Sequence, residues 1–126
     1  MTKDEINKAL DSSDWYMRLW AIRQKNATIA NIRKALSDID YQVRVIAIKH
    51  PNASPSNIDK ALSDCDVRIR VMAMNHQNAN PTNIKKALDD DNIKVKLAAM
   101  NHPNATKANK EKAANDPVLI AYLLKR

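Results

Sequence analysis

The chain has 126 residues and seven more basic than acidic side chains (21 Lys and Arg against 14 Asp and Glu), with one cysteine and no glycine. No apolar run approaches the roughly 18 residues of a membrane span, and the first residues lack the apolar core of a signal peptide. A single cysteine excludes an internal disulfide and suits a cytoplasmic protein, whose positive charge attracts acidic partners.

The tripeptide Lys-Ala-Leu occurs four times at a fixed spacing of 26 residues. It stands at residues 8–10, 34–36, 60–62 and 86–88, and one further step reaches Lys112-Ala113-Ala114. A period between about 20 and 50 residues is typical of stacked repeats. The spacing therefore predicts a single helical-repeat domain over residues 1–126, with units at about 2–27, 28–53, 54–79, 80–105 and 106–126.

Each unit is predicted to begin with a short helix of about two turns. Ser54-Pro55 and Asn80-Pro81 place a capping side chain before a proline at the first helical position, and Thr28 and Thr106 keep the cap without the proline. Apolar residues at i, i+3 and i+4 then form one buried face. Its members are Ile6-Ala9-Leu10, Ile32-Ala35-Leu36, Ile58-Ala61-Leu62 and Ile84-Ala87-Leu88.

An acidic turn leads to a second short helix in each unit. This helix is predicted to start at a capping residue, namely Asp14, Asp40, Asp66 and Asn92. The same spacing predicts its buried face as Met17-Trp20-Ala21, Val43-Ile46-Ala47, Ile69-Met72-Ala73 and Val95-Ala98-Ala99. We also expect Trp15 and Trp20 to be buried, because large aromatic residues would close the first layer.

Asparagine and histidine recur where one unit passes to the next. Because the chain lacks glycine, we predict positive φ at one asparagine of each unit: Asn26, Asn52, Asn78 and Asn104. The histidines are His50, His76 and His102, with Gln24 at the first position. Rings on successive units would be about 8–10 Å apart, too far to share a metal ion, which predicts a hydrogen-bonding role in the turn.

A degenerate motif covers nearly the whole chain. It stands at Asp40-Tyr41-Gln42-Val43-Arg44-Val45-Ile46-Ala47, followed by His50-Pro51-Asn52, and recurs at residues 66–73 and 92–99. This motif resembles the variant leucine-rich repeat, one of the HEAT-like helical repeats. The resemblance implies an all-α, right-handed α-solenoid of about five two-helix repeats, in which some helices can be 3₁₀. Members of such families mostly bind proteins or nucleic acid, and no residue of the enzymes among them can be placed on this chain.

The last unit departs from the motif. Lys110 replaces the buried isoleucine, which suits a polar end cap, and Pro117-Val118 stands where the second cap is expected. Four apolar residues follow: Leu119, Ile120, Leu123 and Leu124. They either fold over the fourth unit or pair with another chain, so self-association is one expectation for this end.

No combination of side chains indicates catalysis. The sequence has no glycine-rich phosphate loop, no paired carboxylates and no Ser, His and Asp in triad order, and Cys65 occupies a variable position. We therefore predict a protein that is not an enzyme, with no catalytic residues, no metal site and no cofactor.

Basic residues form two rows along the second helices. Arg18, Arg44, Arg70 and Lys96 flank the buried face and lie close in sequence to Asp14, Asp40, Asp66 and Asn92, which predicts an Asp–Arg ladder between units. The other row lies at i and i+7 on the side facing away from the core. It comprises Tyr16, Arg23, Gln42, Lys49, Arg68, Asn75, Lys94 and Asn101.

This second row predicts a binding scaffold that presents a basic, amide-rich helical surface to an acidic protein partner. A solvated surface without a ligand is the plain alternative for the row. The alternative function is a nucleic-acid-binding helical-repeat protein that contacts phosphates through Arg and Lys, and a third is an accessory piece of an enzyme. With Trp15 and Trp20 buried, few rings remain for base stacking, which makes single-strand binding weaker.

Overall fold

The computed structural model describes residues 1–125, which form ten α-helices and no β-strand. Their bounds are α1 (Lys3–Ala9), α2 (Trp15–Ile22), α3 (Ile29–Ala35), α4 (Tyr41–Lys49), α5 (Pro55–Ala61), α6 (Val67–Met74), α7 (Pro81–Leu88), α8 (Ile93–Met100), α9 (Lys107–Ala114) and α10 (Pro117–Leu124). The all-α prediction is confirmed. Arg126, the last residue of the expected 106–126 unit, lies outside the described residues.

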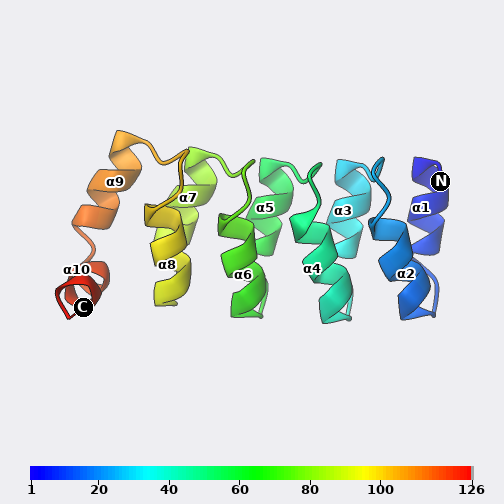
Figure 1. Cartoon of the computed structure of the whole chain (residues 1–126), viewed down its shortest axis with the longest axis horizontal. Helices are drawn as coiled ribbons and strands as arrows, with labels where there is room; N and C mark the ends of the chain where they lie inside the picture. Colours follow the sequence, from blue (N-terminus) through cyan, green and yellow to red (C-terminus); the bar gives the residue numbers. More distant parts are fainter. Residues whose placement is uncertain (126) are drawn as a thin grey trace.

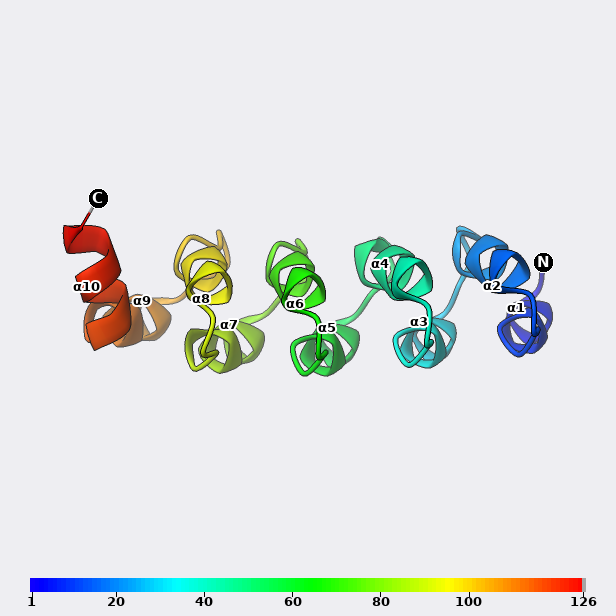
Figure 2. The same cartoon turned by 90° about the horizontal axis from the view of Figure 1, so that it is seen from below.

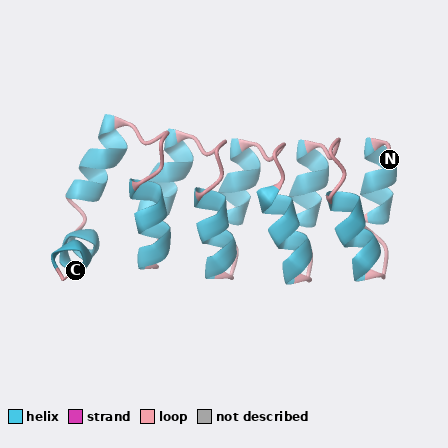
Figure 3. Ribbon diagram, in the orientation of Figure 1, coloured by secondary structure: helices cyan, strands magenta, loops and turns pink. Residues whose placement is uncertain are grey.

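The helices alternate between two rows that run side by side along the molecule (Figures 1 and 2). Odd-numbered helices form one row and even-numbered helices the other, and each helix packs on its pair partner and on the next helix of its own row. Short loops join the helices at both ends, and the two chain termini lie at opposite ends of the molecule (Figure 3).

The helix starts are those that the capping residues predict. Ser54 and Asn80 cap α5 and α7 ahead of a proline, and Thr28 and Thr106 cap α3 and α9. In each of these four helices the third residue is an asparagine that completes a capping box, so two backbone N–H groups are satisfied at each start.

No helix within residues 1–125 has the length and apolar character needed to cross a bilayer.

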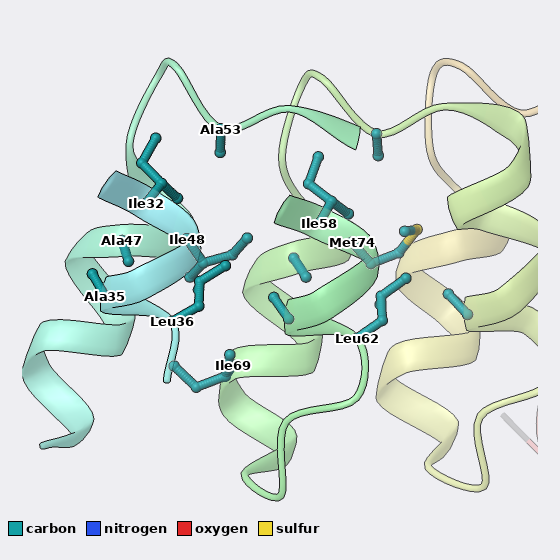
Figure 4. Packing of buried hydrophobic residues seen from close by; sticks show 14 of the residues in the cluster. Ile32, Ala35, Leu36, Ala47, Ile48, Ala53, Ile58, Leu62, Ile69 and Met74 are labelled. Carbon is teal, nitrogen blue, oxygen red and sulfur yellow. The ribbon is translucent and has the colours of Figure 1, made fainter. Parts of the chain in front are cut away.

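One aliphatic core runs the length of the molecule between the two rows. Figure 4 shows the part of it around Ile32, Ile58 and Met74. The predicted face of the odd-numbered helices is confirmed: its isoleucines are Ile6, Ile32, Ile58 and Ile84, all fully buried. Of the alanines and leucines predicted beside them, only Ala9 is half-buried rather than buried. Burial of this face against the neighbouring pair stabilises helices that would be too short to persist alone.

The predicted face of the even-numbered helices is only partly right. Val43 and Ala47 are buried as expected, but Ile46 is half-buried, and Ile48 is fully buried in its place. The α6 helix repeats this pattern, because Met74 is fully buried (Figure 4), whereas Met72 is half-buried. The core-facing side of α4 and α6 is therefore displaced toward Ile48 and Met74, which leaves Ile46 and Met72 at its edge.

The first helix pair exposes the residues that were expected to close it. Trp15 and Trp20 are 42% and 48% exposed, so the prediction that they are buried is wrong. Met17 is also 41% exposed, whereas Val43, one period later, is covered by the preceding helix pair. Helix α2 is the first of its row, and within residues 1–125 it packs only on α1, α3 and α4.

The predicted left-handed asparagines are wrong, because no residue among 1–125 has positive φ. The turn is built around histidine instead. His50 has an extended backbone (φ −64°, ψ 132°), and its Nδ1 accepts the backbone N–H of Asn52 at 3.0 Å. The Asn52 side chain then donates to the carbonyl oxygens of Lys25 and Ala27, at 2.8 and 3.0 Å. Asparagine thus joins consecutive helix pairs rather than relieving backbone strain.

The hydrogen-bonding role of the histidines is confirmed. His76 Nε2 lies 2.9 Å from the carbonyl oxygen of His50, and His102 Nε2 lies at the same distance from that of His76. Since Nδ1 of each ring accepts a backbone N–H, the proton of the neutral ring must be on Nε2, which donates to the preceding pair. Both ring nitrogens are therefore engaged.

Ion pairs between helix pairs are present, but with other acidic partners than predicted. They join Arg18 to Asp38 (2.8 Å), Arg44 to Asp64 (3.0 Å), Arg70 to Asp90 (2.9 Å) and Lys96 to Asp116. The predicted partners Asp14, Asp40, Asp66 and Asn92 cap the even-numbered helices and form no ion pair between helix pairs. The acidic residue two positions before each cap is the one that faces back to the guanidinium of the preceding pair.

The end of the chain partly follows the expectation for the last unit. Leu119 is buried, so the terminal helix does fold against α8 and α9, but Ile120, Leu123 and Leu124 remain exposed. Asp116 rather than Pro117-Val118 provides the cap. Helix α10 lies crosswise to the other even-numbered helices (Figures 1 and 2).

Candidate binding face of the even-numbered helices

The eight residues of the predicted binding row are all exposed. Four lie near the start of α2, α4, α6 and α8: Tyr16, Gln42, Arg68 and Lys94. The other four lie at the ends of the same helices or immediately after them: Arg23, Lys49, Asn75 and Asn101. The even-numbered helices stand side by side (Figure 2), and residues at i and i+7 share one side of a helix, so the eight residues lie on one face of the molecule.

An apolar stripe runs between these two sets of polar residues. It consists of Trp20, Ile46, Met72 and Ala98, which share one position of the 26-residue period. Trp20 is exposed and the other three are half-buried. Sequence reasoning assigned this stripe to the core, because its spacing from the buried residues of the same helix is that of an amphipathic face. The sequence did offer a sign of the surface position, because apolar residues also stand two positions further on, at Ile22, Ile48 and Met74. The structure buries these three fully.

Grooves lie between neighbouring even-numbered helices where the stripe passes. The groove between α4 and α6 has a volume of about 590 Å³, and Met72, Lys49 and Asn75 are among its lining residues. Between α2 and α4 a groove of about 490 Å³ is lined by Ile46, Arg23 and Lys49, with a smaller one beside it. The groove between α6 and α8 is about 270 Å³ and contains Ala98 and Asn101. The grooves thus repeat with the helix pairs.

None of these four grooves is lined by an aspartate or glutamate. The nearest acidic side chains of the even row are Asp14, Asp40 and Asp66, which cap the N-termini of the helices beside Tyr16, Gln42 and Arg68. Positive charge is concentrated at the first groove, through Arg23, Lys25 and Lys49. The face is therefore apolar along its middle and basic at the end where α2 and α4 meet.

Arg68 is held in place by its neighbours rather than free in solvent. Its guanidinium lies 4.1 Å from the centre of the Tyr41 ring and pairs with Asp66 at 2.7 Å. The Arg68 side chain, and then its backbone N–H, hold the pKa of Asp66 at about 2. Arg68 is thus a fixed, partly neutralised cation, which makes Arg23 and Lys49 the stronger electrostatic features of the face.

Other basic residues singled out in the sequence are committed to structure. Arg44 donates to Asp64 and also to the backbone carbonyl of Asp38 at 2.9 Å, so it joins two helix pairs and closes its own turn. Hydrogen bonding to Asp38 raises the pKa of Arg18. Because these guanidinium groups are largely covered, they do not contribute to the exposed face.

The aromatic residues of α2 extend the face at its first end. Tyr16 and Trp20 are one helical turn apart, and the Trp15 ring meets the Tyr16 ring edge-on, with centroids 5.7 Å apart. Sequence reasoning placed the tryptophans in the core and so missed them as surface residues. Exposed rings beside Arg23 provide flat apolar contact area next to positive charge.

Residues 1–125 contain no group of three or more His, Cys, Asp and Glu side chains arranged to hold a metal ion, and Cys65 is exposed and free. Comparison of the chain with protein-family models, with curated proteins and with solved structures gives no match. The function therefore has to be inferred from the face itself.

Proposed function

We propose that the chain is a short right-handed α-solenoid of the HEAT-like or variant leucine-rich repeat kind, and that it acts as a non-enzymatic scaffold binding an acidic protein partner. The partner contacts the face formed by the apolar stripe Trp20, Ile46, Met72 and Ala98 and the eight exposed residues beside it. The 26-residue period, the two helix rows and the bonds that repeat between pairs support this fold class.

The observation that carries the function is the composition of the grooves. Apolar side chains line them, the flanking residues are basic or amides, and no carboxylate is among them. An acidic partner gains charge complementarity from Arg23 and Lys49 and buries apolar surface on the stripe. We place this scaffold in the cytoplasm, where the exposed thiol of Cys65 stays reduced.

The test is site-specific photo-crosslinking in cells. A crosslinking amino acid at Gln42 should capture a defined partner, and the Arg23→Glu and Lys49→Glu double variant should lose it. The matched control is Arg33→Glu with Lys85→Glu, which changes the net charge equally on exposed residues of the odd-numbered row. Equal capture by both double variants would overturn the proposed face.

A nucleic-acid partner is the second candidate, and the exposed rings of α2 favour it. Trp20 and Tyr16 stand beside Arg23, an arrangement suited to stacking a base while a phosphate is neutralised. A labelled oligouridine tests this candidate at about 50 mM salt, where the electrostatic contribution is strong. Binding that weakens steeply with salt and is lost in Trp20→Ala would favour nucleic acid over protein.

Self-association remains a proposal for the other end of the molecule. Val118, Tyr122 and the lysine that follows α10 line an open groove with Ile93, and Leu124 is 81% exposed. Sedimentation of the protein across a range of concentrations would detect a second copy on this surface, and Leu124→Glu should then restore the monomer.

A further inference from the structure

The grooves of the binding face are evenly repeated, and the repeat distance limits what can occupy them. Each lies between consecutive even-numbered helices, and each contains one member of the apolar stripe: Ile46, Met72 and Ala98 in turn. Helices that pack side by side are about 8–10 Å apart. A ligand that uses all three grooves must therefore present a side chain on the same side every 8–10 Å.

One regular backbone conformation places every third residue on the same side at this spacing. A polyproline II segment has three residues per turn and rises about 3.1 Å per residue, so residues i and i+3 face the same way about 9 Å apart. A β-strand presents the same side about every 7 Å, and an α-helix returns to it every turn of about 5.4 Å. The groove spacing favours the polyproline II segment.

The charges along the face give the ligand a direction. The groove between α2 and α4 has three basic lining residues, Arg23, Lys25 and Lys49. The next groove retains only Lys49 among charged residues, and the groove between α6 and α8 has none, with Asn75 and Asn101 at its rim. Acidic residues of a ligand are thus favoured over α2 and α4, whereas the groove between α6 and α8 has no charged lining residue to attract them.

We infer that the binding face takes an extended polyproline II segment of the partner, with an apolar residue at every third position and acidic residues at the end that lies over α2 and α4. The amides of Asn75 and Asn101 suit this ligand, because the backbone of such a segment leaves its own N–H and C=O groups free to bond. This inference rests on the proposed function, since it describes the partner of the same face.

A synthetic peptide can serve as the probe. It carries three glutamates followed by three copies of Leu-Pro-Ser, which place a leucine at every third position. One control peptide has the same residues reordered so that the leucines are two and four apart, and another replaces the glutamates by glutamine. Fluorescence anisotropy of labelled peptides gives the affinities, and nuclear magnetic resonance shift changes locate each peptide on the protein.

The first peptide should bind about tenfold more tightly than the reordered one, because reordering moves only the middle leucine out of register and the outer two stay six residues apart. The glutamine peptide should bind about tenfold more weakly than the first. Shift changes should cover Ile46, Met72 and Ala98. The Lys49→Glu variant should lose the first peptide, whereas Arg33→Glu should retain it.

Equal affinity for the first and the reordered peptide, both lost in Lys49→Glu, would overturn the spacing inference and leave the proposed function standing. Failure of every peptide to bind at millimolar concentration would overturn the inference, while photo-crosslinking at Gln42 decides the proposed function independently. Tighter binding of an oligouridine than of the first peptide, at the same site, would replace the protein segment by a nucleic acid.

Discussion

Lys96 and Asp116 form an ion pair that joins the fourth helix pair to the fifth, while the same aspartate caps α10. One carboxylate oxygen of Asp116 accepts from Lys96, and the other accepts the backbone N–H of Val118 at 2.9 Å. In earlier pairs two residues share these tasks, since Asp38 pairs with Arg18 and Asp40 caps α4. Merging them starts the last helix two residues early in the 26-residue period, and that helix lies crosswise (Figure 2).

The two tasks of Asp116 can be separated by substitution. Asp116→Asn keeps a good capping side chain but loses the ion pair, and should lower the free energy of unfolding by about 1–2 kcal/mol. Asp116→Ala loses the cap as well and should cost about 1 kcal/mol more. Urea unfolding followed by circular dichroism measures both. Equal effects of the two variants would show that the cap contributes nothing.

The same ion pair predicts a pH dependence. Hydrogen bonding from Lys96 lowers the pKa of Asp116 below its ordinary value near 3.8. The folded state therefore binds this proton less readily than the unfolded chain, so the contribution is complete above about pH 4 and is lost as the pH falls through the lower folded pKa. The stability difference between the natural chain and Asp116→Asn should be constant from about pH 5 to 8 and shrink below about pH 4. A difference that grows on acidification would contradict this.

Two methionines of α6 test which side of the even-numbered helices is the core. Met74 is fully buried, and Met74→Ala should cost about 2–5 kcal/mol because it leaves a cavity. Met72 belongs to the half-buried stripe, so Met72→Ala should cost about 1 kcal/mol or less. Urea midpoints of the two variants give the comparison. The reverse order would restore Met72 to the core and remove the apolar stripe from the surface.

Helix positions and caps could be predicted from sequence because they depend on local chemistry. Ser54 followed by Pro55 marks a helix start whatever packs around it, and the isoleucine of each first helix has one neighbouring surface to bury against. The second helix is harder, because both Met72 and Met74 are apolar. Which of them is buried depends on how the helix is rotated between two neighbours, and short helices have few residues to define that rotation.

The structure of the turn and of the binding face could not be fully predicted from sequence, because both depend on contacts between helix pairs. Positive φ at Asn52 was a reasonable expectation for a chain without glycine, but a histidine side chain satisfied the turn and left the asparagine to bond the preceding pair. The exposed row was recognisable from i and i+7 spacing, and its members are indeed exposed. The apolar stripe between them could not be predicted, because its exposure depends on how each helix is rotated about its own axis.

The ladder of ion pairs predicts unequal effects at one arginine. Arg44→Met leaves Asp64, which is nearly buried, without its cation, and should cost about 3 kcal/mol. Arg44→Lys should cost about 1 kcal/mol, because lysine makes the equivalent pair at Lys96 but cannot also form the planar fork. Thermal unfolding of both variants measures the difference. Equal losses would indicate that the geometry of the guanidinium, rather than the charge, is what matters.

The histidine ladder predicts a loss of stability that surface substitutions beside it do not share. His76 is buried and bonds through both ring nitrogens, to the carbonyl of His50 and to the backbone N–H of Asn78. His76→Ala should therefore cost about 2–3 kcal/mol, since two backbone groups lose a partner and a cavity is left. Gln77→Ala, one residue away and exposed, is the control and should change stability by less than about 0.5 kcal/mol. Amide hydrogen exchange should also speed up at Asn78 in the His76→Ala variant, because its N–H is then open to water. Unchanged exchange at Asn78 would mean that the turn keeps its shape without the ring and that the histidines are not what joins the pairs.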